Sequence, residues 1–230
     1  MKKIAPSPVK LIVLVAMILI MVTGCKKTDE PETVTDIDGN VYKTVVIGTQ
    51  TWMAENLKTT KYNNGNPIPN VTSEIDWDGL TTDAFCWYNN DATTHKALYG
   101  ALYNWYAVNT DNLCPTGWHV PTDAEWTTFI NFLDGRDYAG GKMKEMGTSH
   151  WAAPNTEASD AYGFKALPAG DRSAEIAFGF WGIGEYAAWW SSTGKDATHS
   201  YYLEAYYDSG TGYKTYTNNR FGFSVRCIKN

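Results

Sequence analysis

Several segments alternate hydrophobic and polar residues with a period of two, which is typical of half-buried β-strands. Residues 34–42 alternate around Asp38-Gly39-Asn40 and predict a hairpin of two short strands. Residues 43–47 and 50–52 predict another strand, a tight turn and a strand. Strict alternation in 221–227 also predicts a strand, and its core face comprises Phe221, Phe223, Val225 and Cys227.

Two segments have the spacing of amphipathic helices. The first is 98–108, in which the apolar positions are Leu98, Ala101, Leu102, Trp105 and Val108. In the second, Thr122 and Glu125 form a capping box, and Asp134-Gly135 ends the helix. Its apolar face comprises Trp126, Phe129, Ile130 and Leu133. Capping explains Glu125, so we expect a structural role for it rather than a catalytic one.

Composition indicates a folded domain behind a short tether. The 230 residues are 43% hydrophobic and 14% aromatic but only 19% charged, which excludes a disordered chain. Residues 61–83 are rich in Asn, Gly, Pro and Thr and predict a surface loop. No internal repeat is visible, so we expect one domain over residues 34–230.

The N-terminal segment has the features of a secretion signal. Three lysines precede an apolar run at 11–22, whose 12 residues rise about 18 Å as a helix, too short to span a bilayer. Val22-Thr23-Gly24-Cys25 resembles the lipobox of bacterial lipoproteins, which implies a signal peptide over 1–24, a lipidated Cys25 and a tether over 25–33. An ordinary secretory signal is the alternative. Charged residues 26–30 resemble the export signal that sends lipoproteins of Bacteroidetes-type bacteria to the outer face of the outer membrane, which implies a domain that faces the cell exterior.

Net charge limits the partners. The chain carries −6, and loss of Lys2, Lys3 and Lys10 with the signal leaves 16 basic and 25 acidic residues, or −9. An acidic surface without a basic stretch disfavours nucleic acid and favours neutral or cationic ligands. We expect membrane attachment through the lipid anchor.

Cysteine spacing indicates no metal centre. Besides Cys25, the chain has Cys86, Cys114 and Cys227, so an oxidising compartment would allow one bridge and leave one thiol. No Cys-x-x-Cys pair or zinc-type His/Cys cluster occurs. Asp36-x-Asp38-Gly39-Asn40 departs from the EF-hand loop at its sixth and twelfth positions. The sequence predicts no metal and no cofactor.

Several long motifs resemble one family. They are Gln50–Leu57, Cys86–Asn90, Leu113–Trp126, Trp190–Ser192 and Gly222–Cys227. Together they are similar to the Fibrobacter succinogenes major paralogous domain over residues 34–230. The resemblance implies a C-type lectin-like fold of class α+β, in which two helices pack on a twisted antiparallel sheet with long irregular loops.

The same resemblance implies a disulfide between Cys114 and Cys227, which leaves Cys86 as a buried thiol. It does not imply calcium-dependent sugar binding, because the strings nearest to the lectin calcium triplets are Ala153-Pro154-Asn155 and Trp190-Ser191-Ser192, which lack the required carboxylates. In the Trp118-His119-Val120-Pro121 turn, we expect His119 to be a hydrogen-bonded structural residue.

The segment 191–220 is rich in Tyr, Ser, Thr and Asn, a composition found in antibody paratopes. Alternation over 201–207 points Leu203 and Ala205 inward and Tyr202, Glu204 and Tyr206 outward. Ordinary packing of a sheet surface is the alternative explanation. The predicted ligand contacts are Trp190, Tyr202, Tyr206, Tyr213, Tyr216, Asn218 and Asn219.

Three functions fit the sequence. We expect a non-catalytic binding or adhesion module for glycan or protein ligands, carried by an outer-membrane lipoprotein. A variable receptor-binding protein of the diversity-generating-retroelement type is an alternative. A cell-surface glycan hydrolase is the third, with a carboxylate pair drawn from Asp134, Glu145, Glu157 and Asp160.

Overall fold

The computed structural model of the chain describes residues 1–3, 32–175 and 179–230. Residues 31–230 form one compact unit. The predicted signal peptide beyond residue 3, the predicted lipidation site Cys25 and the tether as far as residue 31 lie outside the described residues. Within the described ranges, no helix is long and apolar enough to cross a membrane.

The first sheet contains strands from both the beginning and the end of this unit's sequence. Its order is β1-β2-β3-β12-β6, and all of its strand pairs are antiparallel. The two predicted hairpins are confirmed, and residues 41–47 form one continuous strand that belongs to both of them. The strands are β1 (Thr33–Thr35), β2 (Val41–Ile47), β3 (Gln50–Met53), β6 (Trp118–His119) and β12 (Ile228–Lys229).

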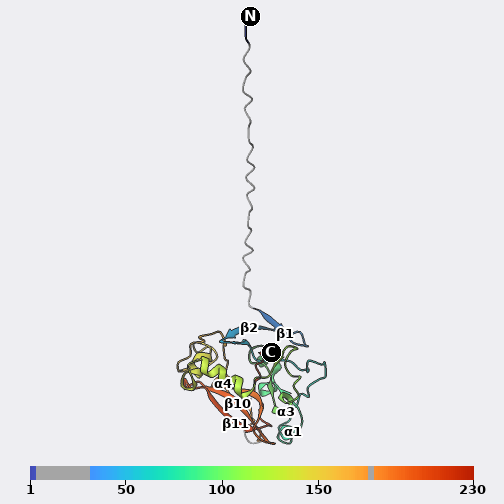
Figure 1. Ribbon diagram of the computed structural model, residues 1–230. Coiled ribbons are helices and arrows are strands. Elements are labelled where there is room, and N and C mark those ends of the chain that lie inside the picture. The colour runs from blue at the N-terminus through green and yellow to red at the C-terminus, as the bar shows by residue number, and fades with distance from the viewer. Residues whose placement is uncertain (4–31, 176–178) are drawn as a thin grey trace. The chain divides into compact units, whose positions relative to one another are not determined.

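The second sheet has the order β11-β10-β9-β7-β8, with β7 parallel to β9 and the other pairs antiparallel. In Figure 1, β10 and β11 lie at the bottom of the unit and β1 and β2 at the top. Its strands are β7 (Ala169–Arg172), β8 (Phe180–Ile183), β9 (Tyr186–Gly194), β10 (His199–Tyr206) and β11 (Tyr213–Asn218). A separate pair joins β4 (Phe85–Cys86) to β5 (Leu102–Tyr103).

The predicted capping-box helix is confirmed as α4 (Asp123–Phe132). The Thr122 hydroxyl accepts from the Glu125 N–H, and the Glu125 carboxylate accepts from the Thr122 N–H at 2.7 Å. The predicted apolar face of α4 packs in one cluster with Trp52 of the first sheet and Trp189 of the second. The helix therefore joins the two sheets (Figure 1).

The predicted helix over 98–108 is wrong. The chain forms α2 (Ala92–Tyr99), then β5, then α3 (Trp105–Val108). Gly100 ends α2 at φ 77°, where a Cβ would stand 2.7 Å from the Leu57 carbonyl oxygen. The apolar spacing is real, but close packing at Gly100 breaks the segment.

Three further short helices carry weak sequence signals. The loop at 61–83 contains α1 (Glu74–Asp78), and η1 is a single 3-10 turn (Tyr88–Asn90). After α4 comes α5 (Arg136–Met143), whose two central glycines lower helix propensity. A Cβ on Gly140 would stand 2.2 Å from the Thr211 carbonyl oxygen, so the glycine allows the 210–212 turn to pack on the helix.

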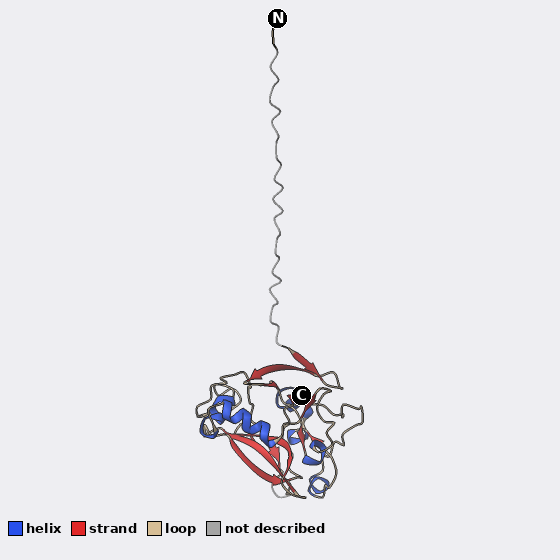
Figure 2. Cartoon of the chain, in the orientation of Figure 1, coloured by secondary structure: helices blue, strands red, loops and turns tan. Residues whose placement is uncertain are grey.

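The C-terminal segment crosses the centre of the unit. Residues 222–227 are buried on both sides and pair with Tyr103, Arg172 and Trp189 as single bridges instead of a regular strand. The predicted core face is confirmed for Phe223, Val225 and Cys227, but the opposite face is buried as well. The architecture is thus α+β and mostly β, with few helices on curled antiparallel sheets (Figure 2).

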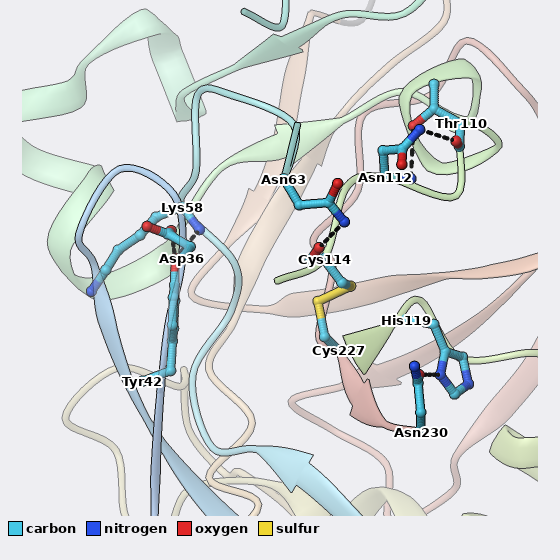
Figure 3. Close-up of a disulfide and its surroundings, with 10 residues drawn as sticks. All are labelled: Asp36, Tyr42, Lys58, Asn63, Thr110, Asn112, Cys114, His119, Cys227 and Asn230. Atoms are coloured by element: carbon cyan, nitrogen blue, oxygen red, sulfur yellow. Dashed lines mark hydrogen bonds between the residues drawn. A yellow bond between two sulfur atoms is a disulfide. The ribbon is translucent and has the colours of Figure 1, made fainter. Parts of the chain in front are cut away.

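A disulfide fixes this segment. Cys114 and Cys227 are bonded across 113 residues of sequence, as predicted, while Cys86 is a buried free thiol. Figure 3 shows the bond beside the Asn63 side chain, which donates to the Cys114 carbonyl oxygen at 3.0 Å. His119 lies nearby, hydrogen-bonded to Asn230 at 2.6 Å and to Glu125 at 2.9 Å, so its predicted hydrogen bonding is confirmed.

Candidate ligand-binding site

Two of the predicted ligand contacts are structural residues instead. Trp190 is fully buried, and its indole N–H donates to the Tyr103 carbonyl oxygen at 2.7 Å. Asn219 is 1% exposed, and its side-chain oxygen accepts from the Ser200 hydroxyl at 2.7 Å. Neither side chain is accessible to a ligand: Phe223, from the buried C-terminal segment, covers the Trp190 ring at 4.6 Å, and the Asn219 carbonyl oxygen accepts from the Trp105 N–H at 2.9 Å.

The other five predicted contacts lie on two faces of the second sheet. Tyr213 is paired with Glu204 and shares its face with Tyr202 and Tyr206. Tyr216 and Asn218 are paired with Tyr201 and His199, so they lie on the opposite face. The structure therefore brings together only Tyr202, Tyr206 and Tyr213.

Neighbouring aromatic rings cover part of each of these three tyrosines. Tyr202 is half-buried under Phe223 at 4.6 Å, so the buried C-terminal segment covers much of it. The Tyr206 ring packs against a tilted Tyr186 ring at 4.9 Å and meets the Tyr213 ring edge-on at 6.0 Å. Leu203 and Ala205 face the opposite core, as predicted.

A row of side chains crosses the second sheet on the Tyr206 face. Trp181 pairs with Asp171, and Glu204 pairs with Ala188 on one side and with Tyr213 on the other. Asp171 and Ala188 each follow a residue of the parallel pair Gly170–Ala187, so they also share a face. The row thus reads Trp181, Asp171, Ala188, Glu204 and Tyr213 across five strands.

A hollow of about 360 Å³ opens at the Trp181 end of this row. A volume of this size is within the range of small-ligand sites. Trp181 is 49% exposed, and its ring lies 5.3 Å from that of Tyr186. The lining residues are Asp171, Ser173, Glu175, Trp181 and Phe221.

The hollow has two buried carboxylates beside it. Glu204 is 8% exposed and accepts from the Tyr186 hydroxyl at 2.8 Å and from the Tyr206 hydroxyl at 3.2 Å. Asp171 is 7% exposed, and no hydrogen bond to its carboxylate comes from residues 32–175 or 179–230. Burial, with the Glu204 charge adding to it, raises the pKa of Asp171 to about 7.

No basic side chain neutralises this pair in the described part of the chain. None of its ion pairs involves Asp171, Glu175 or Glu204. Arg172 follows Asp171 but points away, donating to the Val71, Thr72 and Ser73 carbonyl oxygens. The hollow is therefore an acidic site with aromatic walls.

The carboxylates considered for hydrolysis lie elsewhere, and most have partners. Asp134 pairs with Lys142, and Glu145 pairs with His150 at 2.5 Å. The Asp160 carboxylate accepts from the Lys165 N–H at 2.7 Å. Across the described ranges, no three His, Cys, Asp or Glu side chains are grouped to hold a metal ion.

Sequence reasoning missed Asp171, Trp181, Tyr186 and Phe221 as parts of a site. The signal for Asp171 is a charged residue in the otherwise small and apolar stretch Ala169-Gly170, which the structure buries as β7. Trp181 lies between Gly179 and Gly184, and glycines in this spacing are typical of turns. The pairing of β7 with β8 and β9 brings these residues to Glu204, and no local pattern encodes that pairing.

The family model of the Fibrobacter succinogenes major domain matches residues 45–229. The chain belongs to this family. The matched range contains every residue of the hollow and both half-cystines of the disulfide. No curated protein and no solved structure matches the chain.

Proposed function

We propose that this protein is a non-catalytic binding module of an outer-membrane lipoprotein and that it holds a glycan or protein ligand in the hollow at Trp181. One observation carries the proposal: a half-exposed tryptophan, Trp181, and a buried carboxylate, Asp171, which has no ion-pair partner among the described residues, line the same hollow. Aromatic faces stack on sugar rings and on apolar side chains, and a carboxylate fixes the orientation of a bound group.

The position of the hollow supports recognition. Ligand sites on sheets are more accurately shaped than sites on loops, because neighbouring strands fix each side chain. Asp171 and Trp181 are held by the β7–β8 pair, and Tyr186 comes from β9.

We propose further that the fold is C-type lectin-like. The terminal strands β1 and β12 belong to one sheet, and a disulfide ties the region after α3 to the last segment. These are features that the family resemblance implies. A crystal structure superposed on lectin domains would test this proposal.

Binding is tested with glycan and peptide arrays, using a Cys25→Ser chain that lacks the lipidation site. We expect a ligand whose affinity falls at least tenfold in Trp181→Ala. Tyr216→Ala is the matched control, because Tyr216 is 46% exposed but lies on the other face of the sheet. Loss of binding in the control alone would place the site elsewhere.

Catalysis and anchoring are tested separately. Release of sugar from a polysaccharide panel by the wild-type chain, abolished in Asp171→Asn, would replace the binding proposal with hydrolysis. Anchoring predicts that the wild-type chain fractionates with the outer membrane of its host and that Cys25→Ser does not. Equal fractionation of the two chains would contradict the anchor.

A further inference from the structure

Resting on the proposed binding function, we infer that the hollow recognises an organic cation, an ammonium group at the end of an alkyl chain or on a small ring. The lining residues carry this inference: the buried carboxylate of Asp171, a second acid, Glu175, and the aromatic side chains of Trp181 and Phe221 all line the hollow. Carboxylates with aromatic faces are the groups that bind ammonium ions in proteins.

Asp171 points to a missing positive partner. A charged carboxylate that is more than nine-tenths buried is costly unless an opposite charge or hydrogen-bond donors compensate it. Two tyrosine hydroxyls donate hydrogen bonds to the Glu204 carboxylate. No side chain or backbone group of the described residues donates a hydrogen bond to the Asp171 carboxylate, which is 7% exposed. An ammonium group in the hollow would supply both the charge and the hydrogen bonds.

The groups around Asp171 are acidic or neutral. Those that face it are Glu204 and Tyr186 from the neighbouring strands, Tyr206 beyond them, Tyr88 from η1 and Glu175, which also lines the hollow. Among the described residues, Arg172 is the adjacent cation on β7, and it is committed to the other side of that strand, where its guanidinium stacks on Trp77 at 4.3 Å. At the other end of the row, the Arg136 guanidinium lies over the Tyr213 ring at 5.2 Å. The field in the hollow therefore repels anions and attracts cations.

The aromatic walls distinguish an organic cation from a metal ion. Within the described residues, no group of three His, Cys, Asp or Glu side chains could ligate a metal. The exposed Trp181 ring instead offers the π-face that contributes about 0.5–2 kcal/mol to ammonium binding. Alkyl carbons next to the nitrogen would also bury against Phe221.

Affinity should depend on the protonation of Asp171. With a pKa of about 7, a proton competes with the ammonium group in acid. We therefore expect the affinity to rise nearly tenfold per pH unit between pH 5 and 6.5 and to level off above pH 8. In Asp171→Asn, this dependence should disappear.

The experiment is calorimetry on the Cys25→Ser chain at pH 8 with cadaverine, choline and the ring pair cyclohexylamine and cyclohexanol. We expect at least one cation to bind, and cyclohexylamine to bind tighter than cyclohexanol. Asp171→Asn and Trp181→Ala should each weaken the cation at least tenfold. Asp111→Asn, which changes an exposed carboxylate elsewhere, should leave the affinity unchanged.

The outcomes separate this inference from the proposed function. Binding of neutral sugars or peptides that requires Trp181 but is unchanged in Asp171→Asn would overturn the cation inference and leave the binding function standing. Calcium binding that requires Asp171, without any ammonium binding, would also overturn it. If no probe or array ligand of any charge requires Trp181, both proposals fail.

Discussion

Burial beside Glu204 raises the pKa of Asp171 to about 7, so its carboxyl group keeps a proton at pH values where an ordinary aspartate is ionised. Between about pH 4 and 7 the folded chain therefore binds this proton more tightly than the unfolded chain does. The free energy of unfolding should fall as pH rises through this window and stay low above it.

The substitution Asp171→Asn should remove this loss of stability at high pH. A shift of about three pKa units corresponds to roughly 4 kcal/mol at most, so the variant should be more stable than wild type at pH 8 by up to that amount and similar at pH 4. Urea unfolding at the two pH values measures the difference. Asp111→Asn is the control and should match wild type at both, and a variant of Asp171 that is less stable at pH 8 would contradict the account.

Burial also raises the pKa of a cysteine thiol, that of Cys86. Desolvation raises its pKa to about 11, so it carries little thiolate at neutral pH and is shielded from reagents. In the Cys25→Ser chain without reductant, iodoacetamide should label no cysteine when folded and Cys86 alone when unfolded in urea. Labelling of Cys114 or Cys227 before reduction would contradict the observed pairing.

For single residues, the direction of a side chain could be predicted from the alternation along its strand. Which other segment of the chain covers that side chain could not. The faces of Leu203, Ala205 and Tyr206 follow from their spacing in one strand. Trp190 lies on the same face as Tyr206 but is buried, because a segment more than 30 residues further along the sequence lies over it. A local pattern gives the direction of a side chain but not what covers it.

Among the helices, α4 begins at Asp123 because Thr122 and Glu125 form reciprocal hydrogen bonds that cap its first turn. Thr122→Ala leaves the Glu125 N–H without its partner and should lower the free energy of unfolding by about 1 kcal/mol. Urea unfolding measures it. Thr128→Ala, on the exposed face of the same helix, should change stability by less than about 0.5 kcal/mol.

The elements that were missed share a physical cause. Gly140 and Gly141 make α5 a poor helix by propensity, and packing against Thr211 and Glu157 compensates for it. Gly100 interrupts a good apolar period for a similar reason, the close approach of Leu57. In both places tertiary contact overrides the local signal, whereas the capping box of α4 depends only on neighbours in sequence.

For the whole molecule, the Cys114–Cys227 disulfide is a covalent link between two distant parts of the chain. Closing a loop with a sequence separation of 113 should stabilise the fold by about 4–5 kcal/mol through the entropy of the unfolded chain. The double variant Cys114→Ala with Cys227→Ala should lose about that much in urea unfolding. Cys86→Ala, which removes a thiol without breaking a bond, should lose about 1 kcal/mol or less, and equal losses would contradict the role of the bond.

The family and the α+β class could be predicted from motifs spread over the chain, all of which lie within the matched residues 45–229. The hollow could not, since it depends on the parallel contact of β7 with β9 and on Phe221 reaching the same face. Such contacts join residues that no short pattern connects.

One contact bears on how the domain should be handled in binding experiments. Lys229 lies 2.6 Å from Glu32, so β12 and the beginning of the described domain meet in the first sheet. That sheet lies at the top of Figure 1, and β10 and β11 of the sheet that carries the hollow lie at the bottom. Immobilising the protein on a sensor chip through its N-terminal side would attach it beside the first sheet, whereas coupling through Lys195 or Lys214 would attach it through the second sheet, which carries the hollow.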